Sequence, residues 1–531
     1  MSDGPLSKLW SSEDGKRRRW LEKVKRYCAL AKPTFRPIDS NETAQEKDLE
    51  ISYTAVGNRG VMNLEGMFLN TMLPIGIPFY AFELAANLMS DGRIPPAVKQ
   101  AMIRDMFMNE LIIGSLMEQS SLLEETRCRR GMRSAMRQVI SYLLVAGDTL
   151  FQLTDDYRMK VFRPEQYVVC RDSCGDVLLT CTREKIDPLA LTEEQFGQTG
   201  LKYDDCKDKY AHDRMEDLYT FNEWNPRSKV WVVKQEMCGR EIIKPSEDKI
   251  SAYISVAYEL LLGDNLGRGF IELQEPDLRT LDELDRRLME AADLATRLHP
   301  LVGQGSQVKD DDFQKETGRV IRNVDVRGGV AQDITFLKVD KTADMNFAMA
   351  LREAKRKDLS ASMLMTGDVM PQKERVTRAQ IDAIQGELQG ATGGIAAPMQ
   401  EEIQLPLIRR AVYQARRDKL LLPMDDDKVS IAVTTGLAAL DREQKRVKLL
   451  ELSQVLASLG PEAQARLNPS VFISTYQRFS SFYVEGLIKD DAQVQAEQQQ
   501  MMANQAQQQA AEKGIDVLGN VVQDSLTPQA A

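Results

Sequence analysis

The sequence predicts a mainly helical α+β protein, because long stretches with helical spacing of apolar residues surround shorter runs of β-branched residues. Helical spacing prevails over residues 56–153, with prolines as breaks. Over residues 158–244 the pattern changes to short strand-like runs, which indicates a small antiparallel β unit among the helices. A chain of 531 residues, 43% of them hydrophobic, is expected to form about three compact units.

The first predicted helix covers residues 16–31 and is amphipathic. Its apolar face carries Trp20, Val24, Tyr27, Cys28 and Ala31. Its opposite face is basic and carries Lys16, Arg17, Arg18, Arg19, Lys23 and Arg26. A basic face of this kind can bind nucleic acid, although a solvated helix surface is the more common role of such residues.

Two strand pairs are expected within the β unit. Residues 167–170 and 177–182 are β-branched runs, and the turn-rich residues 171–176 join them. A second pair, at 218–224 and 229–235, flanks the turn sequence Asn-Pro-Arg-Ser. Short runs joined by such turn residues are typical of antiparallel hairpins.

The most regular helix is predicted at residues 278–298, where apolar residues alternate three and four apart. The seam consists of Leu281, Leu284, Leu288, Ala291, Ala295 and Leu298. Such a heptad seam packs one helix against another that runs nearly parallel to it. His299 and Pro300 should end the helix, and strand-like pieces such as 334–339 follow. A second helix, roughly 36 Å long, is expected at 341–364, so that the two helices form a stalk with a β knob.

Residues 365–376 are predicted to be a loop that contains the charged run Lys-Glu-Arg. A third long helix should begin at Thr377, where a capping box is encoded, and should kink near Gly393. A strand is predicted at 429–433, followed by further helix. The Gln/Ala/Met-rich residues 492–511 are either disordered or form a helix that orders only on assembly.

The formal net charge of −10 bears on the partners of the protein. A protein that grips nucleic acid usually has a basic excess, so tight binding of DNA over the whole surface is disfavoured. The most apolar stretch, residues 61–89, is interrupted by Asn, Glu and Pro residues. It is therefore expected to lie inside the protein rather than in a membrane. The first ten residues lack the apolar segment of a signal peptide, and seven scattered cysteines indicate reduced thiols, so synthesis in a cytoplasm is expected.

Motifs for catalysis are not evident in the sequence. It lacks the Gly-rich phosphate cradle of common ATP-driven motors, and its two histidines, His212 and His299, cannot form a His-Glu-x-x-His metal site. Cys170, Cys174 and Cys181 could supply three zinc ligands. Small core or hairpin residues are the more common role of such cysteines, so no zinc site is expected.

Two acidic triplets, residues 310–312 and 425–427, could in principle hold magnesium for a two-metal nuclease. Consecutive carboxylates on a loop point in different directions, however, and usually serve only to solvate the loop. The chain is therefore expected to have no metal, no cofactor and no enzymatic activity.

Several short segments occur in one order along most of the chain. They are Thr54-Ala-Val-Gly-Asn-Arg-Gly60 with Asn63-Leu64, Val145-Ala-Gly147, Tyr167-Val-Val169 with Arg171-Asp172 and Gly175, Gly267-Arg-Gly-Phe-Ile271 with Asp277-Leu-Arg279 and Leu281, Lys373-Glu-Arg-Val-Thr377, Gly393-Gly394, Gln404-Leu-Pro-Leu407 and Thr435-Gly-Leu437. The order of these segments along the chain, rather than any one of them, carries a resemblance. In this order the chain resembles the portal (head-to-tail connector) proteins of short-tailed, podovirus-type bacteriophages. The first 50 residues and the C-terminal tail are poorly covered by the resemblance.

The resemblance implies the phage portal fold, in which the subunit is divided into wing, stem, clip and crown and assembles as a ring. The implied wing covers residues 1–277, with the β unit at about 158–244, and residues 377–435, with the kinked helix and the strand. The two stem helices are implied at 278–299 and 341–364, with the clip at 300–340 between them. The tunnel loop is implied at 365–376, and the crown with the Gln/Ala-rich tail at 436–531.

The resemblance also implies a function. About twelve copies would form a ring at one capsid vertex, and double-stranded DNA would be packaged and later ejected through its channel. The packaging terminase, an ATPase, would dock on the clip, and tail and adaptor proteins would replace it. Capsid protein would contact the wing, and internal core proteins would contact the crown. No membrane is implied, and the protein is expected in the virion after synthesis in the host cytoplasm.

Two other functions stay open at this point. One is an internal virion scaffold or core protein without a DNA channel, and the other is an Asp-dependent metal nuclease. Only the portal function requires an annulus with an open centre, which electron microscopy of the purified protein would reveal.

Basic residues are the candidates for contact with DNA in the channel. Those of the tunnel loop are Lys373 and Arg375, with Gln372 beside them. Those of the stem and the clip are Arg352, Lys355, Arg356, Arg319, Arg322 and Arg327. The alternative for each is an ion pair or a solvated charge. A net-acidic ring with sparse basic residues suits a channel in which DNA slides, because each neutralised phosphate adds affinity that would retain the DNA.

Overall fold

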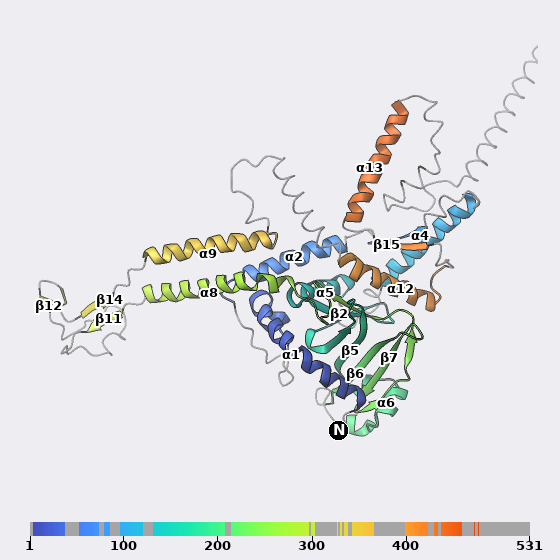
Figure 1. The fold of residues 1–531 in the computed structure, drawn as a ribbon, viewed down its shortest axis with the longest axis horizontal. Helices are drawn as coiled ribbons and strands as arrows, with labels where there is room; N and C mark the ends of the chain where they lie inside the picture. The colour runs from blue at the N-terminus through green and yellow to red at the C-terminus, as the bar shows by residue number, and fades with distance from the viewer. Residues whose placement is uncertain are drawn as a thin grey trace, which may run out of the picture. The chain divides into compact units, whose positions relative to one another are not determined.

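The computed structural model describes residues 4–37, 52–73, 79–84, 96–119, 131–207, 214–296, 299–302, 326–327, 330–331, 334–337, 342–365, 399–422, 429–433, 437–458, 472 and 476. By its contacts the chain divides into two compact units, Met1–Gly436 and Leu437–Ala531. Figure 1 shows the first unit as long helices beside several small β-sheets. Within the described residues, no helix has both the length and the apolar character that crossing a membrane requires.

The main core lies among four helices of the first unit. They are α1 (Pro5–Ala31), α2 (Val56–Met72), α5 (Met132–Ala146) and α8 (Phe270–Thr296). The apolar face predicted for residues 16–31 is confirmed, because Val24, Tyr27, Cys28 and Ala31 are buried in α1.

The first turn of α1 is held by a distant carboxylate. The Glu236 side chain, which is buried, accepts the backbone N–H groups of Leu6 and Ser7 at 2.8 and 3.2 Å. These N–H groups have no partner inside the helix, and Pro5 at the first helical position suits a helix start. The helix therefore begins eleven residues before the predicted start at residue 16.

The predicted β unit is a six-stranded antiparallel sheet. Its strands are β4 (Tyr167–Arg171), β5 (Val177–Ile186), β6 (Glu216–Asn225), β7 (Val230–Met237), β8 (Arg240–Glu241) and β9 (Ser246–Asp248). The four strands predicted from the sequence are confirmed, and β5 and β6 extend beyond their predicted ends. The N-terminal half of α1 covers one face of this sheet, where Trp10 packs with Val168, Cys181 and Phe221.

A second sheet corrects the helix predicted up to residue 153. It consists of β2 (Asp148–Leu153), β3 (Met159–Phe162) and β10 (Tyr253–Ala257), in the order β10-β2-β3. The preceding helix stops at Ala146 because Gly147 adopts the left-handed conformation (φ 84°) that ends many helices.

The strand predicted at 429–433 is confirmed as β15 (Val429–Val433). Its antiparallel partner is β1 (Tyr80–Leu84), which lies in a segment predicted to be helical. The two strands are separated by more than three hundred residues of sequence, from Leu84 to Val429. Helical spacing alone could not reveal such a pairing.

The stalk predicted from the heptad seam is present as two helices that run side by side, α8 and α9 (Thr342–Ser362), shown in Figure 1. At their far end β11 (His299–Val302) pairs with β14 (Ile334–Leu337), and β12 (Val326–Arg327) pairs with β13 (Val330–Ala331). The first helix starts at Phe270, earlier than predicted, and includes Pro276. It ends at Thr296, so His299 and Pro300 belong to a strand.

Several shorter helices and two long ones complete the described fold. They are η1 (Pro33–Phe35), α4 (Pro96–Gln119), η2 (Pro164–Gln166), η3 (Pro188–Ala190), α6 (Glu193–Thr199), α7 (Tyr203–Lys207), the π-helical turn η5 (Gln400–Gln404), α12 (Leu405–Arg417) and, in the second unit, α13 (Leu437–Ser458). The predicted capping box at Thr377 and the kink near Gly393 lie outside the described residues.

Candidate functional site: the helical hairpin and its root

The root of the α8–α9 hairpin is anchored by apolar residues of both helices. Leu278 and Leu281 of α8 and Leu359 of α9 are buried in the main core. Farther from the root the predicted seam is only half-buried, at Leu284, Leu288 and Ala291. Ala295 lies in α8, but its side chain is not among those described, and Leu298 lies outside the described residues.

Two of the predicted DNA-contacting residues form ion pairs between the hairpin helices. The Arg352 guanidinium bonds the carboxylate of Asp285, which is almost fully buried. Lys355 Nζ lies 2.7 Å from Asp277 Oδ1, and this hydrogen bond raises the pKa of the lysine above its ordinary value. Arg356 lies 3.9 Å from Glu353 on its own helix. In the single chain Arg352 and Lys355 therefore link the two helices, whereas Arg356 does not.

Three large apolar side chains of α9 are exposed in the single chain. Phe347 is 73% exposed, and Met349 and Leu351 are 50% and 40% exposed. Phe347 and Leu351 are one helical turn apart, with the small residues Ala350 and Ala354 beside them, so they share one stripe. The stripe is therefore the exposed apolar surface of the hairpin that a contact between copies could use.

The start of α8 is fixed by a close crossing of glycines. The Tyr258 N–H donates to the Gly147 carbonyl at 2.8 Å. A Cβ atom at Gly147 would overlap the backbone of Arg268 and Gly269, and one at Gly267 would overlap the Gly147 carbonyl. Backbones can approach this closely only where both residues lack a side chain. This crossing explains physically why glycine stands at these positions of the sequence.

A buried carboxylate lies beneath this crossing. Asp148 Oδ1 accepts a hydrogen bond of 3.0 Å from the Tyr167 hydroxyl, and Asp148 Oδ2 lies 3.6 Å from the Arg171 guanidinium. Complete burial raises the pKa of Asp148 to about 7, although Arg171 opposes the shift. The carboxyl therefore titrates near neutral pH at the junction between the sheets and the hairpin.

The substitution Asp148→Asn is expected to flatten the pH dependence of stability between the ordinary pKa of 3.8 and about 7. In this window the folded protein binds the proton more tightly than the unfolded chain does, so the wild type loses stability as the pH rises. The loss is on the order of a few kcal/mol. Urea unfolding across this range measures how the free energy of unfolding changes with pH. A loss of stability that the amide causes equally at every pH does not alter this slope. An unchanged slope would show that Asp148 is ionised throughout.

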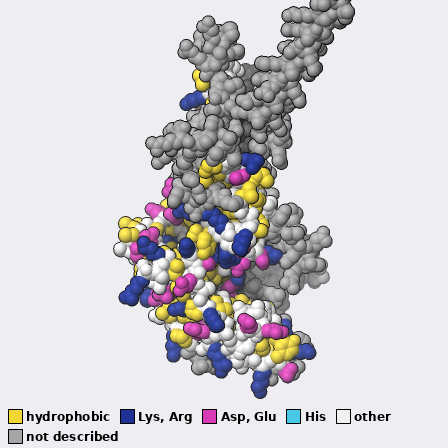
Figure 2. Space-filling model, turned by 90° about the vertical axis from the view of Figure 1, so that its right-hand side faces the viewer, with side chains coloured by type: hydrophobic (Ala, Val, Ile, Leu, Met, Phe, Trp, Pro, Cys, Tyr) yellow, Lys and Arg dark blue, Asp and Glu magenta, His cyan; other side chains and the backbone are white. Residues whose placement is uncertain are grey.

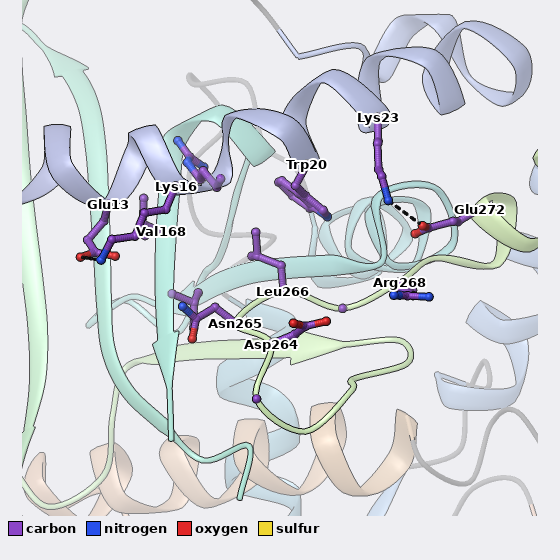
Figure 3. Close-up of a pocket in the computed structure, with 14 residues that line it drawn as sticks. Glu13, Lys16, Trp20, Lys23, Val168, Asp264, Asn265, Leu266, Arg268 and Glu272 are labelled. Carbon is purple, nitrogen blue, oxygen red and sulfur yellow. Dashed lines mark hydrogen bonds and ion pairs between the residues drawn. The ribbon is translucent and has the colours of Figure 1, made fainter. Parts of the chain in front are cut away.

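A cavity of about 340 Å³ lies where α1 crosses β4 and the loop of residues 263–268 (Figure 3). Trp20 and Leu266 face one another across it. Most of the nearby charges are paired, with Lys23 Nζ 3.1 Å from Glu272 and Lys16 Nζ 2.6 Å from Glu13. The fourteen lining residues include no hydroxyl, thiol or imidazole group, and their charged groups are carboxylates, amines and guanidinium groups.

The basic face of α1 is partly used inside the chain. The Arg17 guanidinium is buried and donates to the carbonyls of Pro164, Glu165 and Tyr167, which clamps α1 to the start of β4. Arg26 lies 3.7 Å from Glu275 of α8. On the face shown in Figure 2 cationic and anionic side chains are interspersed, and no extended basic patch is visible among the coloured residues.

The three candidate zinc ligands are placed by β4, β5 and the turn between them. Cys181 is buried, and its pKa is raised by burial, whereas Cys174 is exposed in the turn. Cys170 lies 3.7 Å from a carboxylate oxygen of Glu13. Over the described part of the chain, no three His, Cys, Asp or Glu side chains converge as metal ligands would. The acidic triplets at 310–312 and 425–427 lie outside that part.

The side chains of the remaining candidate DNA contacts are not among those that the structure describes. Gln372, Lys373 and Arg375 of the tunnel loop, and Arg319 and Arg322 of the clip, lie outside the described residues. Arg327 lies in β12, whose side chains are not described.

Comparison with known proteins places the chain in a family. The model of the family described as bacteriophage head to tail connecting protein matches residues 4–482. The chain belongs to this connector family. It is 27% identical to the portal protein of Escherichia phage T7, over 94% of this chain and 90% of that protein. The portal proteins of Enterobacteria phages T3 and SP6 are 26% and 25% identical, over 94% and 95% of this chain and 90% and 93% of their own.

The resemblance to podovirus portal proteins is thereby confirmed for the connector. Among solved structures, a chain of the native gene transfer agent virion covers 80% of this connector and 89% of its own length, with a TM-score of 0.36 and 10% identity.

Sequence reasoning missed two polar residues of α2 that hold the connector together. Glu65 is completely buried, where it binds Lys32, Arg137 (3.2 Å) and the Ser141 hydroxyl (2.5 Å). Asn63 donates to the backbone at the end of α9. In the sequence Glu65 is only an interruption of an apolar stretch, and Asn63 is such an interruption and part of a segment shared with the portal proteins. Polar groups inside such a stretch are buried at high cost unless they have partners, and that rule could have identified them.

Proposed function

We propose that this connector assembles into a closed ring of about twelve copies, which forms a channel for double-stranded DNA at one capsid vertex. The ring would serve first in genome packaging and later in ejection. The match to the connector family over residues 4–482 carries this proposal. The role is one of passage and docking, and it requires no catalytic residue.

The α8–α9 hairpin is the element best suited to form the wall of the channel. Its two helices are tied by ion pairs at Asp277 and Asp285, so the hairpin can act as a rigid strut. The apolar stripe of α9 around Phe347 would pack against the hairpin of the next copy. A contact between two different faces, repeated by a rotation that closes, forms a ring.

The charge of the subunit suits a channel through which DNA slides. The Arg352 and Lys355 cations are neutralised by carboxylates of α8, which limits their attraction for phosphate. About twelve copies with −10 each would carry about −120, which repels DNA from most of the surface. Contacts with DNA would then be confined to sparse positions such as the tunnel loop.

The other segments would provide the docking surfaces. The clip, residues 300–340, would receive the packaging terminase and later the tail and adaptor proteins. The wing would contact the capsid protein, and the crown, residues 436–531, would contact internal core proteins. We also propose that the chain is synthesised in the host cytoplasm and retained in the virion.

The double substitution Lys373→Ala/Arg375→Ala is expected to reduce DNA packaging or retention severalfold while the ring still forms. Each lost cation removes a contact with phosphate from every copy. Packaged DNA per particle, measured by nuclease protection, gives the effect, and Lys357→Ala on the exposed side of α9 is the control.

The first experiment is electron microscopy of the purified connector. An annulus with an open centre supports the proposal. A closed particle or a persistent monomer would favour an internal scaffold and would overturn the channel. Unchanged packaging and retention in the double variant, in rings that are intact, would overturn the tunnel-loop assignment alone.

A further inference from the structure

The end of α9 contains a leucine in an unusual backbone conformation. Leu364 has φ of +54°, in the left-handed region. The Met365 N–H donates to the Ser360 carbonyl at 2.9 Å, back across the last turn of the helix. Glycine is the usual residue at the left-handed position of such a helix end, because a Cβ atom there clashes with the backbone. The turn is therefore strained, and its surroundings must hold it in place.

Asn63 of α2 supplies the contacts that hold this turn. Its side-chain Nδ2 donates to the Met363 carbonyl at 3.1 Å and to the Leu364 carbonyl at 2.9 Å. Carbonyls at a helix end lack partners inside the helix, so one amide satisfies two of them. Gly60, one turn earlier on α2, makes room for Met363, because a Cβ atom there would overlap the methionine sulfur.

The same region of the chain also contacts the other hairpin helix. Asp282 of α8 accepts hydrogen bonds from the Ser52 hydroxyl at 2.6 Å and from the backbone N–H groups of Tyr53 and Thr54 at 2.6 and 3.1 Å. The segment of residues 52–63 therefore binds α8 at its start and α9 at its end. It joins the roots of both helices to the main core.

We propose that Asn63 is a positioning residue, which holds the strained turn at Leu364 and so fixes the direction in which the chain leaves α9. The part of this inference that concerns DNA rests on the proposed function, because the chain continues from this turn toward the predicted tunnel loop at 365–376. The contacts between Asn63 and the turn do not depend on that function.

The first test is hydrogen exchange at the end of α9, measured by mass spectrometry on the full-length protein. In Asn63→Ala, the Leu364 and Met365 amides should exchange on the order of tenfold faster, because two hydrogen bonds to the turn are lost. Asn58→Ala, at an exposed position of the same helix, is the matched control and should leave exchange unchanged. Equal exchange in the two variants would overturn the proposal.

The second test asks whether Asn63 opposes backbone strain. Glycine adopts the left-handed conformation without a clash, so Leu364→Gly should restore slow exchange in the Asn63→Ala background. Leu364→Ala removes the same side chain but keeps the strain, so it should not restore it. Rescue by alanine as well as by glycine would show that the Leu364 side chain, and not the backbone, matters.

The third test measures packaged DNA in particles with Asn63→Ala. A severalfold loss of packaged or retained DNA, recovered by Leu364→Gly, is expected in rings that look normal by electron microscopy. Normal DNA content despite faster exchange would overturn the link to the channel and leave the positioning role intact. Absence of rings in the wild type would instead overturn the proposed function, whatever the exchange data.

Discussion

The substitution Phe347→Asp is expected to keep the connector monomeric under conditions in which the wild-type chain forms rings. Phe347 is 73% exposed on the apolar stripe of α9, so the change costs the single chain little. In a ring the same position would be buried against the next copy. An unpaired carboxylate there costs several kcal/mol, and the cost recurs at every interface of the ring.

Sedimentation velocity and electron microscopy report the loss of rings, and circular dichroism verifies that the monomer is folded. Tyr203→Asp is the matched control, because this aromatic residue of α7 is 58% exposed and lies in the sheet region. Rings that form equally well in the Phe347→Asp variant would show that the apolar stripe is not the contact between copies. They would leave membership in the family untouched.

The second large effect is expected from Glu65→Leu, which should reduce the free energy of unfolding by about 3–5 kcal/mol. Glu65 of α2 is completely buried against α5, and it is the carboxylate partner of Lys32. Arg137 is half-exposed and can turn to water, whereas the Lys32 side chain is mostly buried and would keep an unpaired charge. Denaturant unfolding measures the loss.

The pH dependence separates this mechanism from a simple packing defect. Burial already lowers the pKa of Lys32 from its ordinary value of 10.5, although Glu65 opposes the shift. Without Glu65 the pKa should fall further, so the folded protein binds the proton less tightly than the unfolded chain. The deficit of Glu65→Leu should therefore shrink as the pH rises toward 10.5. Glu65→Gln, which preserves shape, should lose less, and a deficit that is constant with pH would contradict the unpaired-lysine mechanism.

Local sequence pattern predicted the elements whose contacts are local. The spacing of Leu281, Leu284 and Leu288 indicated a helix packed on another helix, and α8 and α9 are that pair. The turn residues between 170 and 177 indicated the β4–β5 hairpin. In both cases the signal comes from residues that lie close together in the sequence.

The sequence could not predict contacts that form across the chain. The strand β1 reads as part of a helical stretch, and only its pairing with β15 makes it a strand. From their charge, Arg352 and Lys355 are candidates either for contact with DNA or for an ion pair. Their partners, Asp285 and Asp277, lie some seventy residues away, at separations of 67 and 78 positions, and only the register of the two helices brings them together.

The pairing of β1 with β15 also means that this small sheet can form only late in the synthesis of the connector. Tyr80–Leu84 emerge from the ribosome long before Val429–Val433 are synthesised. Until then the backbone N–H and C=O groups of the early strand lack their partner strand. Contacts between such distant segments form slowly, and chains that wait for them are prone to associate wrongly. An unpaired β1 is therefore the segment of the nascent connector most exposed to pairing with another chain until the late strand has emerged.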